Sequence, residues 1–319
     1  TLRAAPLAWT SSGASGHRLP DHRSEPWGQM AGGKNNRVLV YTRIRPPKDK
    51  EAKDGIAVAV DEFASTVTLE DRNDREPRVF PCDGAFGPDA SQDQVFERVG
   101  QPILDSVLDG YNGCVLAYGQ TGSGKTHSLL NTGGTAVDAG LVPRLAAALF
   151  FAISQDVRSV FVVRVSFYQI YNEQIDDLLK PHGANTNLKL KTSPTGSVEV
   201  ESATSKAVAS PAELMELFNS GRKNIVYAET RMNKASSRSH AVFQMTVEKR
   251  ARVLDVGSEA AGESSPLAVA KAEGGPVEAT VVTGKLTVAD LAGSERVKRS
   301  GAGEDTAGAR FKEAVNINT

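Results

Sequence analysis

The sequence has few cysteines, almost no net charge and no long apolar run. Its two cysteines, Cys82 and Cys114, are too few for a disulfide framework and match no metal-ligand spacing, so a reducing, intracellular compartment is the simplest interpretation. No apolar stretch is long enough to span a bilayer as a helix. The formal net charge of −1 gives no bulk attraction to a polyanion, and any acidic partner must therefore meet a local basic patch.

The composition is that of an ordinary globular protein, with 40% apolar and 24% charged residues. A chain of 319 residues can form one large domain or two. Residues 1–36 show neither helical nor strand periodicity and carry no secretory signal. We expect them to be either a disordered N-terminal extension or upstream sequence joined to the protein by an incorrect gene prediction.

One glycine-rich stretch fits the phosphate-binding loop pattern G-x-x-x-x-G-K-[ST]. It consists of Gly119, Gln120, Thr121, Gly122, Ser123, Gly124, Lys125 and Thr126. The apolar run 114–118 predicts the strand that must precede such a loop, and a helix is expected to open at Thr126. The backbone N–H groups of the loop bind phosphate, the lysine reaches the outer phosphates, and the threonine hydroxyl can ligate Mg²⁺. An ordinary glycine-rich turn would not combine all these features, so we expect a nucleoside triphosphate to bind here.

Strand and helix patterns alternate along the chain, which predicts an α/β fold with its ligand at the carboxyl ends of the strands. Strands are expected at residues 37–45, 56–60, 66–69, 78–80, 114–118, 159–170, 241–248 and 281–289. Helices are expected at residues 91–108 with a kink at Pro102, from Thr126, across 141–152, and after a capping box at Ser210–Glu213.

Two segments are not expected to contribute to a site. Residues 171–179 are predicted to form a strand that runs into a short helix and serves as scaffold. Residues 251–280 lack aromatic side chains and are rich in Ala, Gly, Glu, Ser and Pro. This composition predicts a low-complexity, disordered loop insertion.

Two polar stretches accompany the phosphate loop. In Asp290-Leu291-Ala292-Gly293-Ser294-Glu295, the aspartate ends a predicted strand, where it can hold Mg²⁺ through water. In Asn233-Lys234-Ala235-Ser236-Ser237-Arg238-Ser239-His240, hydroxyl groups, an amide and a guanidinium could complete a metal shell and position water. Taken singly, the first also fits a plain strand-to-turn aspartate and the second a polar turn.

The three stretches together, in this order, resemble the motor domain of the kinesin family. The resemblance runs from about Arg37 to the last residue and includes Phe86-Gly87-Pro88 and residues 168–179. It implies a P-loop NTPase-like fold with a mixed central β-sheet flanked by helices on both faces. Because the family's motor domain continues past the helix that would start at residues 312–318, residues 37–319 are expected to form an incomplete motor domain.

The resemblance also implies a role for each matching residue. Arg43, Pro46 and His127 would flank the adenine, although His127 could simply begin a helix. Mg²⁺ would be held by Thr126 and Ser237, and by Asp290 through water. The residues implied in catalysis are Asn233, Ser236 and Ser237 of a first switch, Gly293 of a second switch, and Arg238 and Glu295 as the ion pair that closes the site and orients water.

The function implied by the resemblance is that of an ATP-hydrolysing, microtubule-based motor with ATP and Mg²⁺ as its cofactors, located in the cytoplasm on microtubules. Four basic residues near the second switch could meet the acidic microtubule surface, although such residues are usually only solvated: Lys298, Arg299, Arg310 and Lys312. No nucleic acid and no membrane is expected as a partner. The oligomeric state cannot be predicted from these 319 residues.

Other functions remain open from the sequence. The protein could be a non-motile microtubule-binding or regulatory relative of kinesin, or a truncated inactive fragment. A P-loop GTPase is disfavoured, because Asn233-Lys234-Ala235-Ser236 lacks the aspartate of the N-K-x-D motif that reads guanine.

Overall fold

The computed structural model describes residues 38–53, 56–70, 76–132, 135–181, 184, 187–194, 196, 198–231, 239–251 and 281–295. The chain divides into two compact units, residues 1–39 and 40–319, and every helix and strand named below belongs to the second. The predictions for residues 1–36, for 252–280, and for Asn233, Ser236, Ser237, Arg238, Lys298, Arg299, Arg310 and Lys312 concern residues outside these ranges.

The secondary structure alternates much as the sequence predicts. The strands are β1 (Tyr41–Arg43), β2 (Val58–Asp61), β3 (Thr66–Leu69), β4 (Arg78–Pro81), β5 (Gly84–Phe86), β6 (Gly113–Ala117), β7 (Ser159–Tyr171), β8 (Gln174–Asp177), β9 (Leu190–Thr192), β10 (Val198–Val200), β11 (Lys206–Val208), β12 (His240–Ala251) and β13 (Val281–Asp290). The helices are α1 (Asp49–Ala52), α2 (Gln92–Val95), α3 (Gln101–Leu108), α4 (Lys125–Leu130), α5 (Leu141–Gln155) and α6 (Pro211–Arg231). No described helix is long and apolar enough to cross a membrane.

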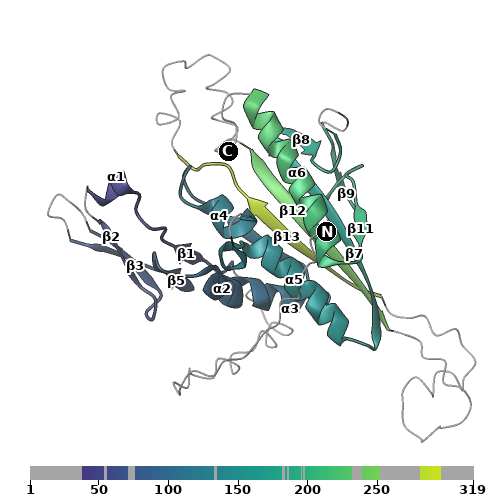
Figure 1. The fold of residues 1–319 in the computed structure, drawn as a ribbon, viewed down its shortest axis with the longest axis horizontal. Helices are drawn as coiled ribbons and strands as arrows, with labels where there is room; N and C mark the ends of the chain where they lie inside the picture. Colours follow the sequence, from purple (N-terminus) through teal and green to yellow (C-terminus); the bar gives the residue numbers. More distant parts are fainter. Residues whose placement is uncertain are drawn as a thin grey trace, which may run out of the picture. The chain divides into compact units, whose positions relative to one another are not determined.

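The main sheet is mixed, as predicted. Its strand order is β11-β7-β12-β13-β6, with β8 paired to β7 as the sixth strand (Figure 1). All neighbours are antiparallel except β13 and β6, which are parallel. β1 and β5 form a separate parallel pair, β9 and β10 an antiparallel pair, and β2, β3 and β4 a small antiparallel sheet. Because β6 and β13 are parallel neighbours, their carboxyl ends meet at one edge of the main sheet.

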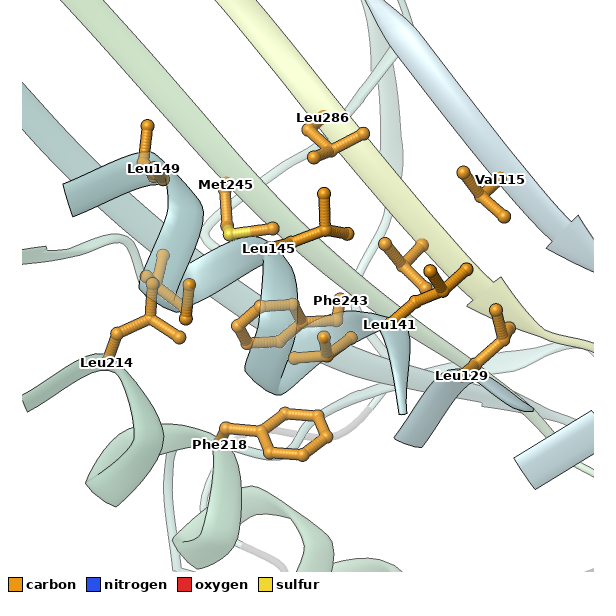
Figure 2. Close-up of a cluster of buried hydrophobic side chains, with 14 of the residues drawn as sticks. Val115, Leu129, Leu141, Leu145, Leu149, Leu214, Phe218, Phe243, Met245 and Leu286 are labelled. Carbon is orange, nitrogen blue, oxygen red and sulfur yellow. The ribbon is translucent and has the colours of Figure 1, made fainter. Parts of the chain in front are cut away.

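Helices α3, α4, α5 and α6 share one hydrophobic core with one face of the main sheet. Figure 2 shows the side chains of Leu145, Leu214 and Phe218 from the helices close to those of Phe243 and Met245 from β12. Phe243 is fully buried, and its ring packs edge-on against both Phe218 and Phe167 of β7. The intervening residues of these strands, among them Tyr168 and Val242, point to the other face of the sheet, where they form a smaller cluster with strand β8. The described helices therefore cover one face of the sheet.

Two predicted helix features appear in modified form. At α6 the Ser210 hydroxyl accepts from the N–H of Glu213, as in a capping box, but the Glu213 carboxylate accepts from the N–H of Ala209, one residue before the cap. In the helical segment from α2 to α3, residues 96–100 form a π-helical turn, in which the N–H of Gln101 donates to the carbonyl of Phe96. This wider turn directly precedes Pro102, which has no N–H of its own to donate.

The prediction that residues 171–179 run into a short helix was wrong. They form a β-hairpin, in which β7 and β8 pair from Tyr171↔Gln174 to Tyr168↔Asp177. Asn172 and Glu173 make the two-residue turn with φ of 48° and 63°, the left-handed values that such a hairpin requires. The sequence offers no glycine there, so the usual signal for a tight hairpin was missing.

Two glycines allow α3 to lie close against the sheet. A Cβ atom on Gly284 of β13 would fall 2.1 Å from the backbone oxygen of Val107. A Cβ atom on Gly113 of β6 would fall 2.5 Å from a side-chain carbon of Ile103. Backbone atoms cannot yield as a flexible side chain can, so the contact at Gly284 is the stricter one.

Gly284→Ala should therefore lower the free energy of unfolding by about 1–3 kcal/mol, because α3 must move away from the sheet to admit the methyl group. Urea denaturation of both proteins measures the change. Thr283→Ala, an exposed position on the opposite face of β13, is the control and should change stability by less than about 1 kcal/mol. Equal effects of the two substitutions would contradict the close approach of α3.

Candidate functional site

The phosphate loop leaves the carboxyl end of β6 and leads into α4, as its motif requires. Gly122 and Gly124 have φ of 79° and 100°, and Gly124 is the residue that precedes the first turn of α4. Both values lie in the left-handed region, which favours glycine over residues with a Cβ. The loop therefore needs glycine at these positions for its backbone path.

Lys125 lies at the start of α4 and folds back over the loop. Its ammonium group donates to the carbonyl of Gly119 at 2.8 Å and to that of Gln120 at 3.2 Å. Burial lowers the pKa of Lys125, and the negative charges of Asp290 and Glu295 act in the opposite direction. The ammonium group of Lys125 therefore interacts electrostatically with two carboxylates that lie more than 160 positions later in the sequence.

Asp290 ends β13 beside the start of α4. Its Oδ2 atom accepts a hydrogen bond of 2.5 Å from the Thr126 hydroxyl, while Oδ1 is buried without a hydrogen-bond partner among the residues that the structure describes. Burial raises the pKa of Asp290, whereas the bond from Thr126 and the charges of Lys125, Arg222 and His240 lower it. Mg²⁺ prefers hydroxyl, carboxylate and water oxygens, and the unpaired Oδ1 can accept from a metal-bound water. Thr126 and Asp290 thus fit the predicted metal site.

Glu295 contacts the phosphate loop directly. Its carboxylate accepts from the backbone N–H of Thr121 at 2.9 Å and from the Thr121 hydroxyl at 2.5 Å. Burial alone would raise the pKa of Glu295, but these bonds and the charge of Lys125 lower it below its usual range. The sequence does not predict this contact, because the two residues are 174 positions apart and belong to separate motifs.

The backbone of the second switch follows the phosphate loop closely. The N–H of Leu291 donates to the Ala117 carbonyl at 3.3 Å, and that of Ser294 donates to the Gly119 carbonyl at 3.2 Å. A Cβ atom on Gly293 would fall 2.3 Å from a Glu295 carboxylate oxygen and 2.4 Å from the Thr121 hydroxyl. With any larger residue at position 293, the side chain of Glu295 or of Thr121 would have to shift from its present place.

Two of the residues expected around the adenine, Arg43 and His127, are linked through Gln92. The Arg43 guanidinium donates to Gln92 Oε1 and to the Ser128 hydroxyl, both at 2.9 Å. The Gln92 amide donates to the His127 carbonyl at 2.9 Å, and its nitrogen lies 3.3 Å from His127 Nδ1. The buried Gln92 was not singled out from the sequence, whose only signal was the Ser91 capping box next to it. Adenine contacts by Arg43, Pro46 and His127 remain predictions.

His240, the last residue of the first-switch motif, links β12 to the second switch. Its Nδ1 atom accepts from the N–H of Ala292 at 3.1 Å, which requires that this nitrogen carry no proton. Burial lowers the pKa of His240, and the charges of Asp290 and Glu173 partly oppose that shift. The neutral ring is therefore the form that holds the two segments together.

The stability of the wild-type protein should fall as the pH drops below about 6.5, because the unfolded histidine then binds a proton that the folded ring resists. His240→Asn keeps a side-chain acceptor but does not titrate, so its stability should change less between pH 7 and pH 5. We expect the difference to reach about 1 kcal/mol, the typical worth of one hydrogen bond. Thermal unfolding of both proteins across this pH range measures it, and parallel pH profiles would contradict the role of His240.

Comparisons with known proteins agree with this geometry. The profile of the kinesin motor domain matches residues 43–319. The chain is 36% identical over 302 residues to human kinesin-like protein KIF13B, covering 89% of this chain and 15% of that protein. It is also 36% identical over 282 residues to the kinesin heavy chain of Caenorhabditis elegans, covering 88% of this chain and 30% of that protein. The chain thus spans less than a third of the length of these relatives.

A solved structure shows the same fold. The structure of a fast kinesin, reported with implications for its ATPase mechanism and its interactions with microtubules, superposes with a TM-score of 0.71. The two are 30% identical in sequence, and the match covers 88% of this chain and 71% of that one. With the profile match over most of its length and the shared fold, the chain belongs to the kinesin motor domain family.

Proposed function

We propose that this chain binds ATP with Mg²⁺ at the edge where β6 and β13 end, hydrolyses it, and couples hydrolysis to the binding of microtubules and to movement along them. The observation that carries the proposal is the direct hydrogen bonding between the second switch and the phosphate loop, in which Thr121 donates to Glu295 and Thr126 donates to Asp290. A site that senses the terminal phosphate needs such contacts between the phosphate loop and the second switch.

The residues of the phosphate loop have defined tasks in this proposal. The N–H groups at the start of α4 bind the inner phosphates, and Lys125 reaches the outer ones. Thr126 and Ser237 would hold Mg²⁺ directly and Asp290 would hold it through water; the bound metal would neutralise charge on the phosphates. Arg43, Pro46 and His127 flank the adenine.

The switch residues supply the catalytic groups. Asn233, Ser236 and Ser237 close on the terminal phosphate and the attacking water, and Gly293 senses the phosphate through its N–H. Arg238 pairs with Glu295 to close the site and orient the water for in-line attack. Catalysis of this type rests mainly on positioning and electrostatic stabilisation of the transition state, and little covalent chemistry is asked of the protein.

Microtubule binding is assigned to basic residues that follow the second switch. Lys298, Arg299, Arg310 and Lys312 come within 20 residues of Glu295 in the sequence. A cluster of positive charge there would meet an acidic surface and act mainly on the rate of encounter and its dependence on salt. The corresponding location is the cytoplasm, on microtubules.

Nucleotide turnover in the presence and absence of polymerised microtubules tests this function. We expect Mg²⁺-dependent hydrolysis of ATP in preference to GTP, and a higher rate when microtubules are added. Sedimentation of the protein with microtubules without any rise in rate would favour the non-motile alternative. Equal turnover of GTP, or no binding of either nucleotide, would contradict the proposal.

Glu295→Ala should keep ATP binding but reduce turnover about 100-fold or more, because a preorganised charge that acts in the transition state contributes about 3 kcal/mol. Phosphate release under saturating ATP measures turnover, and fluorescent ATP measures binding. Glu70→Ala, which removes an exposed carboxylate just after β3, is the control and should turn over normally. Normal steady-state turnover of Glu295→Ala would refute the catalytic assignment.

A further inference from the structure

Several of the donors that a phosphate loop offers to its ligand are occupied by the protein itself. The Thr121 N–H and hydroxyl both donate to Glu295, and the Lys125 ammonium donates to the carbonyls of Gly119 and Gln120. A triphosphate must therefore exchange partners with these groups on entry. The Glu295 carboxylate differs from the two carbonyls in being an anion, as a phosphate is.

We propose that the Glu295 carboxylate occupies the place of the terminal phosphate of ATP, so that Glu295 sets the preference of this site between ATP and ADP. The inference rests on the function proposed above and adds to it a role for Glu295 before catalysis. The residue would hold the Thr121 donors while the terminal phosphate is absent and would release them when ATP binds.

The carboxylate and a terminal phosphate cannot use these donors together. The Glu295 oxygens, the Thr121 hydroxyl and the Gly293 Cα crowd one another so closely that a single added carbon at Gly293 would overlap both side chains. Two anions at this spacing also repel each other strongly in a partly buried site.

ADP would not meet the same competition. The inner phosphates bind to the N–H groups at the start of α4, around Lys125 and Thr126, whereas Thr121 lies earlier in the loop. The Thr126 hydroxyl bonds Asp290, and Glu295 takes no part in that contact. The carboxylate on Thr121 therefore opposes the terminal phosphate selectively.

Release of the carboxylate needs no rearrangement of the core. Thr121 is exposed and Glu295 is half-buried, so rotation of the glutamate side chain alone can bring its charge to solvent. The backbone of the second switch can stay on the loop through Leu291 and Ser294 during this step. Freed from Thr121, Glu295 is then available for the ion pair with Arg238 proposed for catalysis.

The test is the ratio of two affinities in the 319-residue chain without microtubules. Dissociation constants are measured with Mg²⁺ for ADP and for the non-hydrolysable analogue AMP-PNP, which carries a terminal phosphate. Glu295→Ala should bind AMP-PNP about fivefold more tightly than wild type while ADP affinity changes little, because removing a competing state restores the binding-competent fraction. Glu295→Gln, which keeps the size of the side chain but not its charge, should give a smaller gain.

Glu70→Ala serves as the matched control and should leave both affinities unchanged. The inference is overturned if Glu295→Ala changes both affinities by the same factor, leaves both unchanged, or weakens AMP-PNP. Failure of the wild-type chain to bind either nucleotide would instead count against the proposed function. Glu295→Gln keeps the question open to measurement should the alanine variant not fold.

Discussion

The parallel pairing of β6 with β13 is the constraint on which the rest of the site depends. Its register places Ala117 opposite Asp290 at the carboxyl ends of the two strands, so the phosphate loop and the second switch leave the sheet side by side. A shift of one residue would turn Asp290 to the other face and remove its bond to Thr126. β12 fixes this register from the opposite side, through ten residue pairs with β13. The long strands and the aromatic core that packs on them thus hold Asp290 in line with the phosphate loop.

The electrostatics of this edge suit a ligand that is itself charged. Asp290 is buried, one of its oxygens has no partner in the described part of the chain, and the positive charges of Lys125 and Arg222 lower its pKa against the effect of burial. Burial disfavours the charged forms of the carboxylate and of both cations. A metal ion would supply the missing counter-charge for the carboxylate, and an anionic phosphate would supply it for the cations. Burial of these charged groups would then be less costly.

Local patterns in the sequence predicted a large part of this arrangement. The phosphate loop, the strand that ends at Asp290 and the capped helix α6 each depend on residues close in sequence, and each was placed to within a few residues. The contact of Glu295 with Thr121 and the central position of Gln92 could not be predicted, because they arise only when distant segments meet. The hairpin at Asn172 and Glu173 was missed for another reason. Residues with a Cβ rarely adopt left-handed backbone values, and the sequence has no glycine there to indicate a tight turn.

The antiparallel pair of β12 and β13 separates two ends of the sheet. β12 begins at His240, which contacts Ala292 of the second switch, and runs away from it to Ala251, and β13 returns from Val281 to Asp290. With a rise of about 3.4 Å per residue, the connection between them leaves and re-enters the sheet about 30 Å from the phosphate loop. Changes in the length of that connection during evolution would therefore have little effect on the phosphate loop and the second switch. The same position offers a natural place to insert a fluorescent reporter into the head of this protein.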